Sequence, residues 1–193
     1  MRHLASYLLR LIAYYLVLFA VLRGFFLFDS RKYLVATSLA EKLQCFPSAI
    51  KLDLATAAYF VTFTLLLIFI AVLTRKSWMN KVITVFHLIM TLIYAGLAIG
   101  ENLLYREWQA KVGYESLKHF ANISEVLKTP SITMVSYFIL GTMTTFVIFR
   151  WMYRKWVAMP LHFPEYKRNI GFYATVIPIY LALTAGSIIT MRG

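Results

Sequence analysis

Long apolar stretches alternate along the chain with short segments that carry nearly all of the charged residues. A helix that crosses a lipid bilayer needs about 20 apolar residues, each with a rise of about 1.5 Å. Five stretches meet that length, at residues 3–28, 53–74, 80–100, 129–149 and 169–191. The pattern predicts an all-α membrane protein whose single transmembrane domain, residues 1–193, has five spanning helices.

The connection after the first span is too long for a simple turn, and its pattern predicts an amphipathic helix at the membrane interface over residues 30–44. Asp29 and Ser30 are residue types that favour a helix N-cap, and Pro47 is expected to end the helix. Residues with four-residue spacing form an apolar stripe that we expect to enter the lipid. This stripe consists of Val35, Leu39 and Leu43.

The connection after the third span, residues 105–128, predicts further interfacial helices on the same side of the membrane. Leu104, Trp108 and Val112 recur at four-residue spacing, so the third helix is expected to continue beyond its span. A short piece is expected to start at Ser124 and to stop before Pro130. With residues 30–44, these segments form a predicted outer platform.

Basic residues outnumber acidic residues by 20 to 8, and their positions predict the orientation of the chain. The connections at residues 75–81 and 150–168 are strongly basic, and short basic connections stay in the cytoplasm. We therefore expect a cytoplasmic N-terminus and an external C-terminus. The charge of +12 belongs largely to span ends that meet lipid headgroups, so nucleic-acid binding is not expected.

Ionisable residues inside the spans are few, and each is costly in lipid unless it reaches an interface or a partner. Arg10 and Arg23 lie about 20 Å apart along the first helix, so each can extend to its nearer interface. Arg23 can instead meet a lipid phosphate or Asp53. His87 is expected to be a packed, hydrogen-bonded residue rather than a ligand, and Gly141 to mark a close contact between helices.

Four residues at the predicted outer ends of the spans form the candidate site: Arg23, Asp53, Glu101 and Arg106. Arginine binds phosphate through a planar pair of donors, so Arg23 or Arg106 is predicted to contact the headgroup of an anionic, phosphatidylglycerol-like lipid. The alternative is structural. In that case Arg23 pairs with Asp53, Arg106 pairs with an acid of its own helix, and no lipid site exists. For Asp53 and Glu101 two interpretations stay open: they orient lipid headgroups or the outer platform, or they are solvated caps.

No hydrolytic or metal-binding motif is present, and the single Cys45 excludes an internal disulfide and a cysteine-based metal site. Four stretches nevertheless resemble, in order, the membrane domain of lipoteichoic acid synthase-like phosphoglycerol transferases of the sulfatase and alkaline phosphatase superfamily. They are SAIKLDLATAAY at residues 48–59, ENLLYREW at 101–108, ISEVLKT at 123–129 and MRG at 191–193. Glu101 departs from the aspartate that is more usual in the family.

The resemblance implies a bacterial cytoplasmic-membrane protein in which this chain anchors an enzyme and presents lipid to it. The implied partner is an extracytoplasmic catalytic domain that uses a threonine nucleophile and a divalent metal to transfer phosphoglycerol. No catalytic, cofactor or metal position of the family falls within residues 1–193, so whether the chain belongs to an enzyme stays open. Two alternatives are a stand-alone membrane scaffold or adaptor and a small transporter, which would need a polar path through the spans.

Overall fold

The structure is a computed structural model in which the described part of the chain folds into four long helices and one short 3₁₀ turn, with no strand. All four long helices are long and apolar enough to cross a membrane. The all-α, multi-pass prediction is confirmed at this level. The elements are α1 (Arg2–Asp29), η1 (Ser30–Lys32), α2 (Leu39–Thr74), α3 (Met79–Trp108) and α6 (Ile132–Trp156). The described residues are 2–35, 37–74, 76, 78–108, 131–158, 178, 180–182 and 185–186.

The predicted fifth span, residues 169–191, lies mostly outside the described residues, as do the short piece at Ser124 and the platform beyond Trp108. The described residues between 178 and 186 are helical, and Tyr180 packs against the core. The predicted continuation of the third helix is confirmed as far as Trp108. The fourth helix is displaced from the predicted 129–149, because Ser131 caps it by accepting a hydrogen bond from the Met134 N–H at 3.2 Å.

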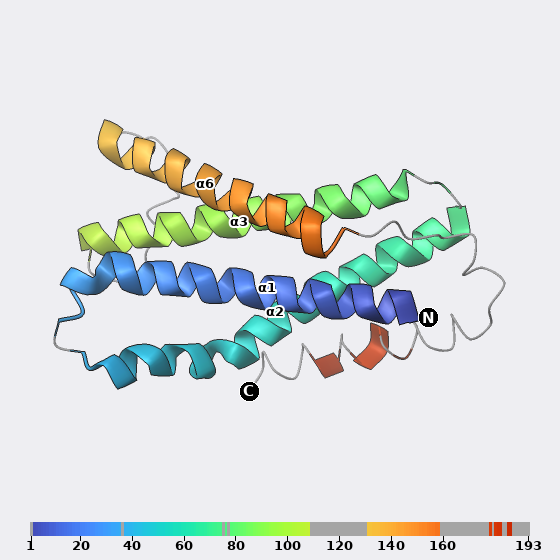
Figure 1. The fold of residues 1–193 in the computed structure, drawn as a ribbon, viewed down its shortest axis with the longest axis horizontal. Helices are drawn as coiled ribbons and strands as arrows, with labels where there is room; N and C mark the ends of the chain where they lie inside the picture. Colours follow the sequence, from blue (N-terminus) through green and yellow to red (C-terminus); the bar gives the residue numbers. More distant parts are fainter. Residues whose placement is uncertain are drawn as a thin grey trace.

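The prediction of a separate helix over residues 30–44 that ends at Pro47 is wrong, because α2 runs without interruption through Pro47. Pro47 has no backbone N–H to bond the Leu43 carbonyl, so α2 continues there with one helical hydrogen bond fewer. One residue further on, Ser48 Oγ donates to the Gln44 carbonyl at 2.8 Å. At about 54 Å, α2 is far longer than the hydrocarbon layer, and Figure 1 shows it changing direction along its length.

The predicted N-cap at Asp29 and Ser30 is also wrong, because the chain makes only the short turn η1 there. Helix α2 is instead capped by Ser38 and Glu41, whose side chains bond each other's backbone N–H groups. The distances are 2.7 Å from Ser38 N to Glu41 Oε2 and 3.2 Å from Glu41 N to Ser38 Oγ, a reciprocal capping box. Val35 therefore precedes the helix that carries Leu39 and Leu43, although all three side chains are exposed.

The core lies along α1, whose buried face carries large side chains against α2, α3 and α6. Helix α6 packs closely on α3, because a Cβ at Gly141 would lie only 3.3 Å from Ile99, which confirms the predicted contact. The opposite face of α6 exposes the apolar side chains of Leu140, Val147 and Trp151, which is compatible with a helix face that meets lipid. Figure 1 shows that the end of α1, the start of α2 and the end of α3 meet at one end of the bundle.

Candidate functional site

A cleft of about 780 Å³ lies between α1, α2 and α3 at this end of the bundle. Its walls combine apolar side chains with five charged residues, two basic and three acidic. We call it the α1–α2–α3 cleft, and its charged residues are Arg23, Lys42, Glu41, Asp53 and Glu101. The volume lies within the range of about 300 to 1,000 Å³ that is usual for small-molecule sites.

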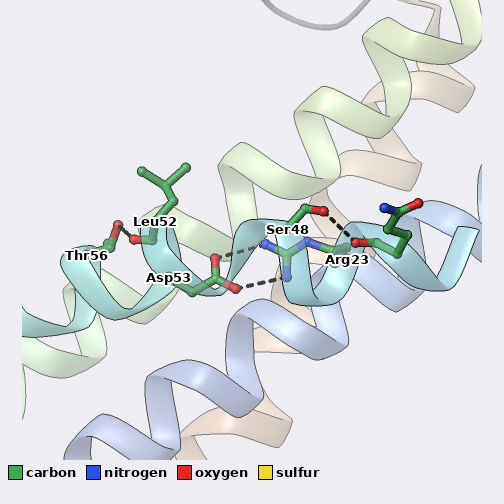
Figure 2. Close-up of polar contacts among 6 residues, drawn as sticks. Arg23, Ser48, Leu52, Asp53 and Thr56 are labelled. Carbon is green, nitrogen blue, oxygen red and sulfur yellow. Dashed lines mark hydrogen bonds and ion pairs between the residues drawn. The ribbon is translucent and has the colours of Figure 1, made fainter. Parts of the chain in front are cut away.

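Arg23 of α1 and Asp53 of α2 form a two-pronged ion pair in the wall of the cleft (Figure 2). Nη1 donates to Oδ2 and Nη2 donates to Oδ1, both at 2.9 Å, and the two side chains are only 21% and 13% exposed. The ring of Phe46 lies 5.8 Å from the guanidinium carbon. The predicted alternative pairing is thus confirmed, and the guanidinium charge is already balanced by a carboxylate.

Glu101 and Asn102 of α3 also line the cleft, and neither has its polar groups satisfied by the protein. Glu101 makes no hydrogen bond or ion pair with any residue that the structure describes. Asn102 is 0% exposed, and both its Oδ1 and its Nδ2 lack a partner. Among the described residues, no other side chain leaves two buried polar atoms without a partner. Asp53 and Glu101 lie well inside α2 and α3, so the alternative in which they cap helices is wrong.

Arg106, the fourth residue of the predicted site, is not among the residues that line the cleft. Its guanidinium carbon lies 5.5 Å from the centroid of the Tyr137 ring on α6, and its carbonyl accepts a hydrogen bond from Tyr33 Oη at 3.4 Å. The structure therefore brings Arg23, Asp53 and Glu101 together and leaves Arg106 on the α6 side. Lipid binding by these residues stays a prediction.

A second group of polar side chains lies deep in the bundle, and we call it the polar layer. It consists of Tyr14, Tyr15, Thr64, His87 and Thr91. His87 is 0% exposed and bonds on both ring nitrogens, to Tyr15 Oη at 2.7 Å and to Thr64 Oγ1 at 3.0 Å. The prediction of a packed, hydrogen-bonded histidine is confirmed.

The hydroxyl bonds fix the direction of every hydrogen bond around a neutral His87. Thr64 Oγ1 donates its only hydrogen to the Phe60 carbonyl at 2.6 Å, so it must accept from His87 Nε2. Nδ1 is then the acceptor for Tyr15. In the same way, Thr91 donates to the His87 carbonyl at 2.7 Å and accepts from Tyr14. Every side chain of the polar layer therefore has a hydrogen-bond partner within the protein. The layer ties α1, α2 and α3 together, and Tyr14 Oη also lies 3.4 Å from the Phe149 carbonyl of α6.

The described residues contain no group of three or more His, Cys, Asp or Glu side chains that would hold a metal ion. No family model, curated protein or solved structure matches the chain. The site must therefore be interpreted from its own chemistry.

Sequence reasoning selected Arg23, Asp53 and Glu101 from their position at span ends, but it missed Asn102 and the partners of His87. Asn102 directly follows Glu101 in an apolar helix, so the presence of a second polar residue there was a signal. Tyr15 and Thr64 gave no such signal, because tyrosine and threonine are ordinary residues of a membrane helix. Only the packing of three helices reveals that they meet His87.

Proposed function

We propose that this chain is a lipid-binding membrane domain whose α1–α2–α3 cleft holds a phospholipid headgroup. One observation carries the proposal: a partly open cleft of about 780 Å³ contains one carboxylate, Glu101, and one buried amide, Asn102, that the described part of the protein leaves without partners. A buried polar group without a partner costs about 1 to 3 kcal/mol. A ligand that enters the cleft and bonds these groups removes this cost.

The surroundings favour a lipid over a water-soluble ligand. The cleft is walled by three helices that are apolar enough to span a membrane, and its lining includes Phe19, Leu22 and Leu97 beside the charged residues. A phospholipid matches this mixture, because its headgroup is polar and its acyl chains are apolar. We infer that the headgroup lies near Arg23, Asp53 and Glu101, while the chains lie along the apolar wall.

The family resemblance suggests what the bound lipid is for. On this proposal, the chain anchors an extracytoplasmic phosphoglycerol transferase-like domain in the bacterial cytoplasmic membrane and presents lipid to it. The N-terminus would be cytoplasmic and the cleft would face outward. A topology reporter inserted after Lys76 is then active only in the cytoplasm, and one fused after Gly193 only outside. The anionic lipid that the sequence predicts is one candidate for the bound headgroup.

The proposal is tested by filling the cleft and counting bound phospholipids by native mass spectrometry. Ala49 lines the cleft, so the Ala49→Trp variant is expected to lose one tightly held lipid relative to the natural chain. Ala13→Trp makes the same chemical change on an exposed position of α1 outside the cleft and is expected to keep that lipid.

The cleft can also be filled by chemical modification of the folded protein, which does not depend on the stability of the Ala49→Trp variant. The single cysteine, Cys45, lines the cleft and is half-buried. Alkylation of the purified protein with N-benzylmaleimide places a bulky group there. Loss of the same lipid supports the proposal. Full retention after both blocks shows that the cleft holds no lipid and overturns it.

A further inference from the structure

We propose that the cleft selects a phospholipid headgroup with a primary ammonium group, which Glu101 and Asn102 bind. This inference rests on the proposed function, because it takes a phospholipid in the cleft as given. It assigns a ligand chemistry that the expectation of an anionic lipid did not include.

The obvious receptor for a phosphate, Arg23, is already occupied. Both of its terminal nitrogens donate to Asp53 at 2.9 Å in the fork geometry that a phosphate would otherwise take. A headgroup that offers only negative charge must therefore compete with a fixed carboxylate. In contrast, the carboxylate of Glu101 has no partner among the described residues.

The sign of the charge in the cleft leads to the same conclusion. Three carboxylates and two cations line it, which leaves a net charge of one negative unit. Glu41 is engaged with Ser38 through hydrogen bonds at 2.7 and 2.9 Å, so Glu101 is the acid left to meet a ligand. A zwitterionic headgroup can place its phosphate toward Lys42 and its ammonium toward Glu101. An anionic headgroup such as phosphatidylglycerol adds a second negative charge and can offer Glu101 only neutral hydroxyl donors, which form weaker hydrogen bonds with a carboxylate than an ammonium group does.

Asn102 distinguishes a primary ammonium from a quaternary one. Its Oδ1 is a buried acceptor without a donor, adjacent in sequence to Glu101. A primary ammonium carries three N–H donors and can serve both oxygens, whereas a trimethylated ammonium carries none. A site built to bond an N–H group rejects an analogue that lacks it, because the buried acceptor is then left unpaired. The Nδ2 of Asn102 remains available for a phosphate or ester oxygen.

The experiment measures headgroup preference by native mass spectrometry in mixed micelles that contain equal amounts of dioleoyl phosphatidylethanolamine, phosphatidylcholine and phosphatidylglycerol. We expect phosphatidylethanolamine to be retained about tenfold over phosphatidylcholine, the effect of one well-made charged hydrogen bond. N-methyl and N,N-dimethyl phosphatidylethanolamine are expected to fall between them, since each methyl group removes one donor. Free ethanolamine and phosphoethanolamine serve as soluble competitors and are expected not to displace the lipid.

Variants assign the preference to the two residues. Glu101→Gln and Asn102→Leu are each expected to lower the ratio of phosphatidylethanolamine to phosphatidylcholine toward one. Glu41→Gln is the matched control, because it makes the same change in the same cleft at a residue bonded to Ser38, and glutamine also serves in a capping box. This control is expected to keep the preference.

The outcomes separate this inference from the proposed function. Equal retention of the three lipids, with one lipid still lost in Ala49→Trp, overturns the ammonium site and leaves the lipid-binding cleft standing. A preference for phosphatidylglycerol overturns it in favour of an anionic lipid. Displacement by free ethanolamine shows that the ligand is a soluble amine and overturns the lipid headgroup. A preference that persists in both Glu101→Gln and Asn102→Leu overturns the assignment to these residues.

Discussion

The polar layer and the α1–α2–α3 cleft both place polar side chains inside a helical membrane domain, but the cleft leaves two of them, Glu101 and Asn102, without partners in the described part of the protein. In the polar layer, His87 forms hydrogen bonds through both ring nitrogens, and the hydroxyls of Thr64 and Thr91 donate to backbone carbonyls. In the cleft, Asn102 is as deeply buried as His87 but bonds nothing. The two residues lie on the same helix, α3.

The difference distinguishes polar side chains that stabilise the fold from polar side chains that are left to bind a ligand. A buried group whose bonds all close within the protein stabilises the arrangement of the helices, and nothing further is needed to explain it. A buried group without partners makes folding less favourable, so its presence points to a function outside the fold. An ionisable residue in a span is therefore weak evidence of a site until its partners are known, and His87 is such a case.

The largest expected effect on the free energy of unfolding comes from breaking the hydrogen bonds of the polar layer. His87→Leu removes both ring bonds and leaves the buried hydroxyl of Tyr15 without its acceptor. We expect a loss of about 2 to 3 kcal/mol in the free energy of unfolding, measured by chemical unfolding in mixed micelles. Lipid retention in the cleft should be unchanged in the folded fraction. An unfolding free energy equal to that of the natural chain would contradict the structural role of the polar layer.

An intermediate effect on the free energy of unfolding is expected at Arg23 and Asp53. These residues line the cleft, but each has its partner within the protein, as the residues of the polar layer do. Asp53→Leu leaves the Arg23 guanidinium without its carboxylate, and we expect a loss of about 1 to 2 kcal/mol, because both side chains are mostly buried. The double variant Arg23→Leu with Asp53→Leu should lose less than the two single variants combined, since neither charge is left alone. Strict additivity in this cycle, again measured by unfolding in mixed micelles, would show that the pair does not couple α1 to α2.

The sequence predicts the class of the fold because spanning helices follow from length and hydropathy alone, which is why α1 lies close to its predicted place and α3 and α6 overlap theirs. The predicted start of α2 is wrong because proline is expected to end a helix, whereas α2 continues through Pro47. The helix start at Ser38 and Glu41 has the Ser-x-x-Glu spacing of a capping box, a more specific signal than the single residues Asp29 and Ser30.

The candidate site was only partly predictable, for a geometric reason. Depth along a helix can be counted from sequence, so Arg23, Asp53 and Glu101 were correctly placed at one end of the bundle. The angular position around each helix depends on packing, which turns Arg106 toward Tyr137 of α6 rather than into the cleft. The same packing makes Asn102 a lining residue.

The smallest expected effect is also the sharpest test of the comparison, because it should have the opposite sign. Asn102→Leu makes on α3 the same kind of change as His87→Leu, but it removes an amide whose two polar atoms have no partners. In lipid-free detergent we expect the variant to be more stable than the natural chain by up to about 1 kcal/mol, since a desolvation cost disappears and no neighbour loses a bond. Added phosphatidylethanolamine should stabilise the natural chain and leave the variant unchanged, because a ligand stabilises only the folded state that binds it. Destabilisation of Asn102→Leu in lipid-free detergent, by an amount similar to that of His87→Leu, would mean that Asn102 is bonded within the protein and that the distinction between the two regions fails.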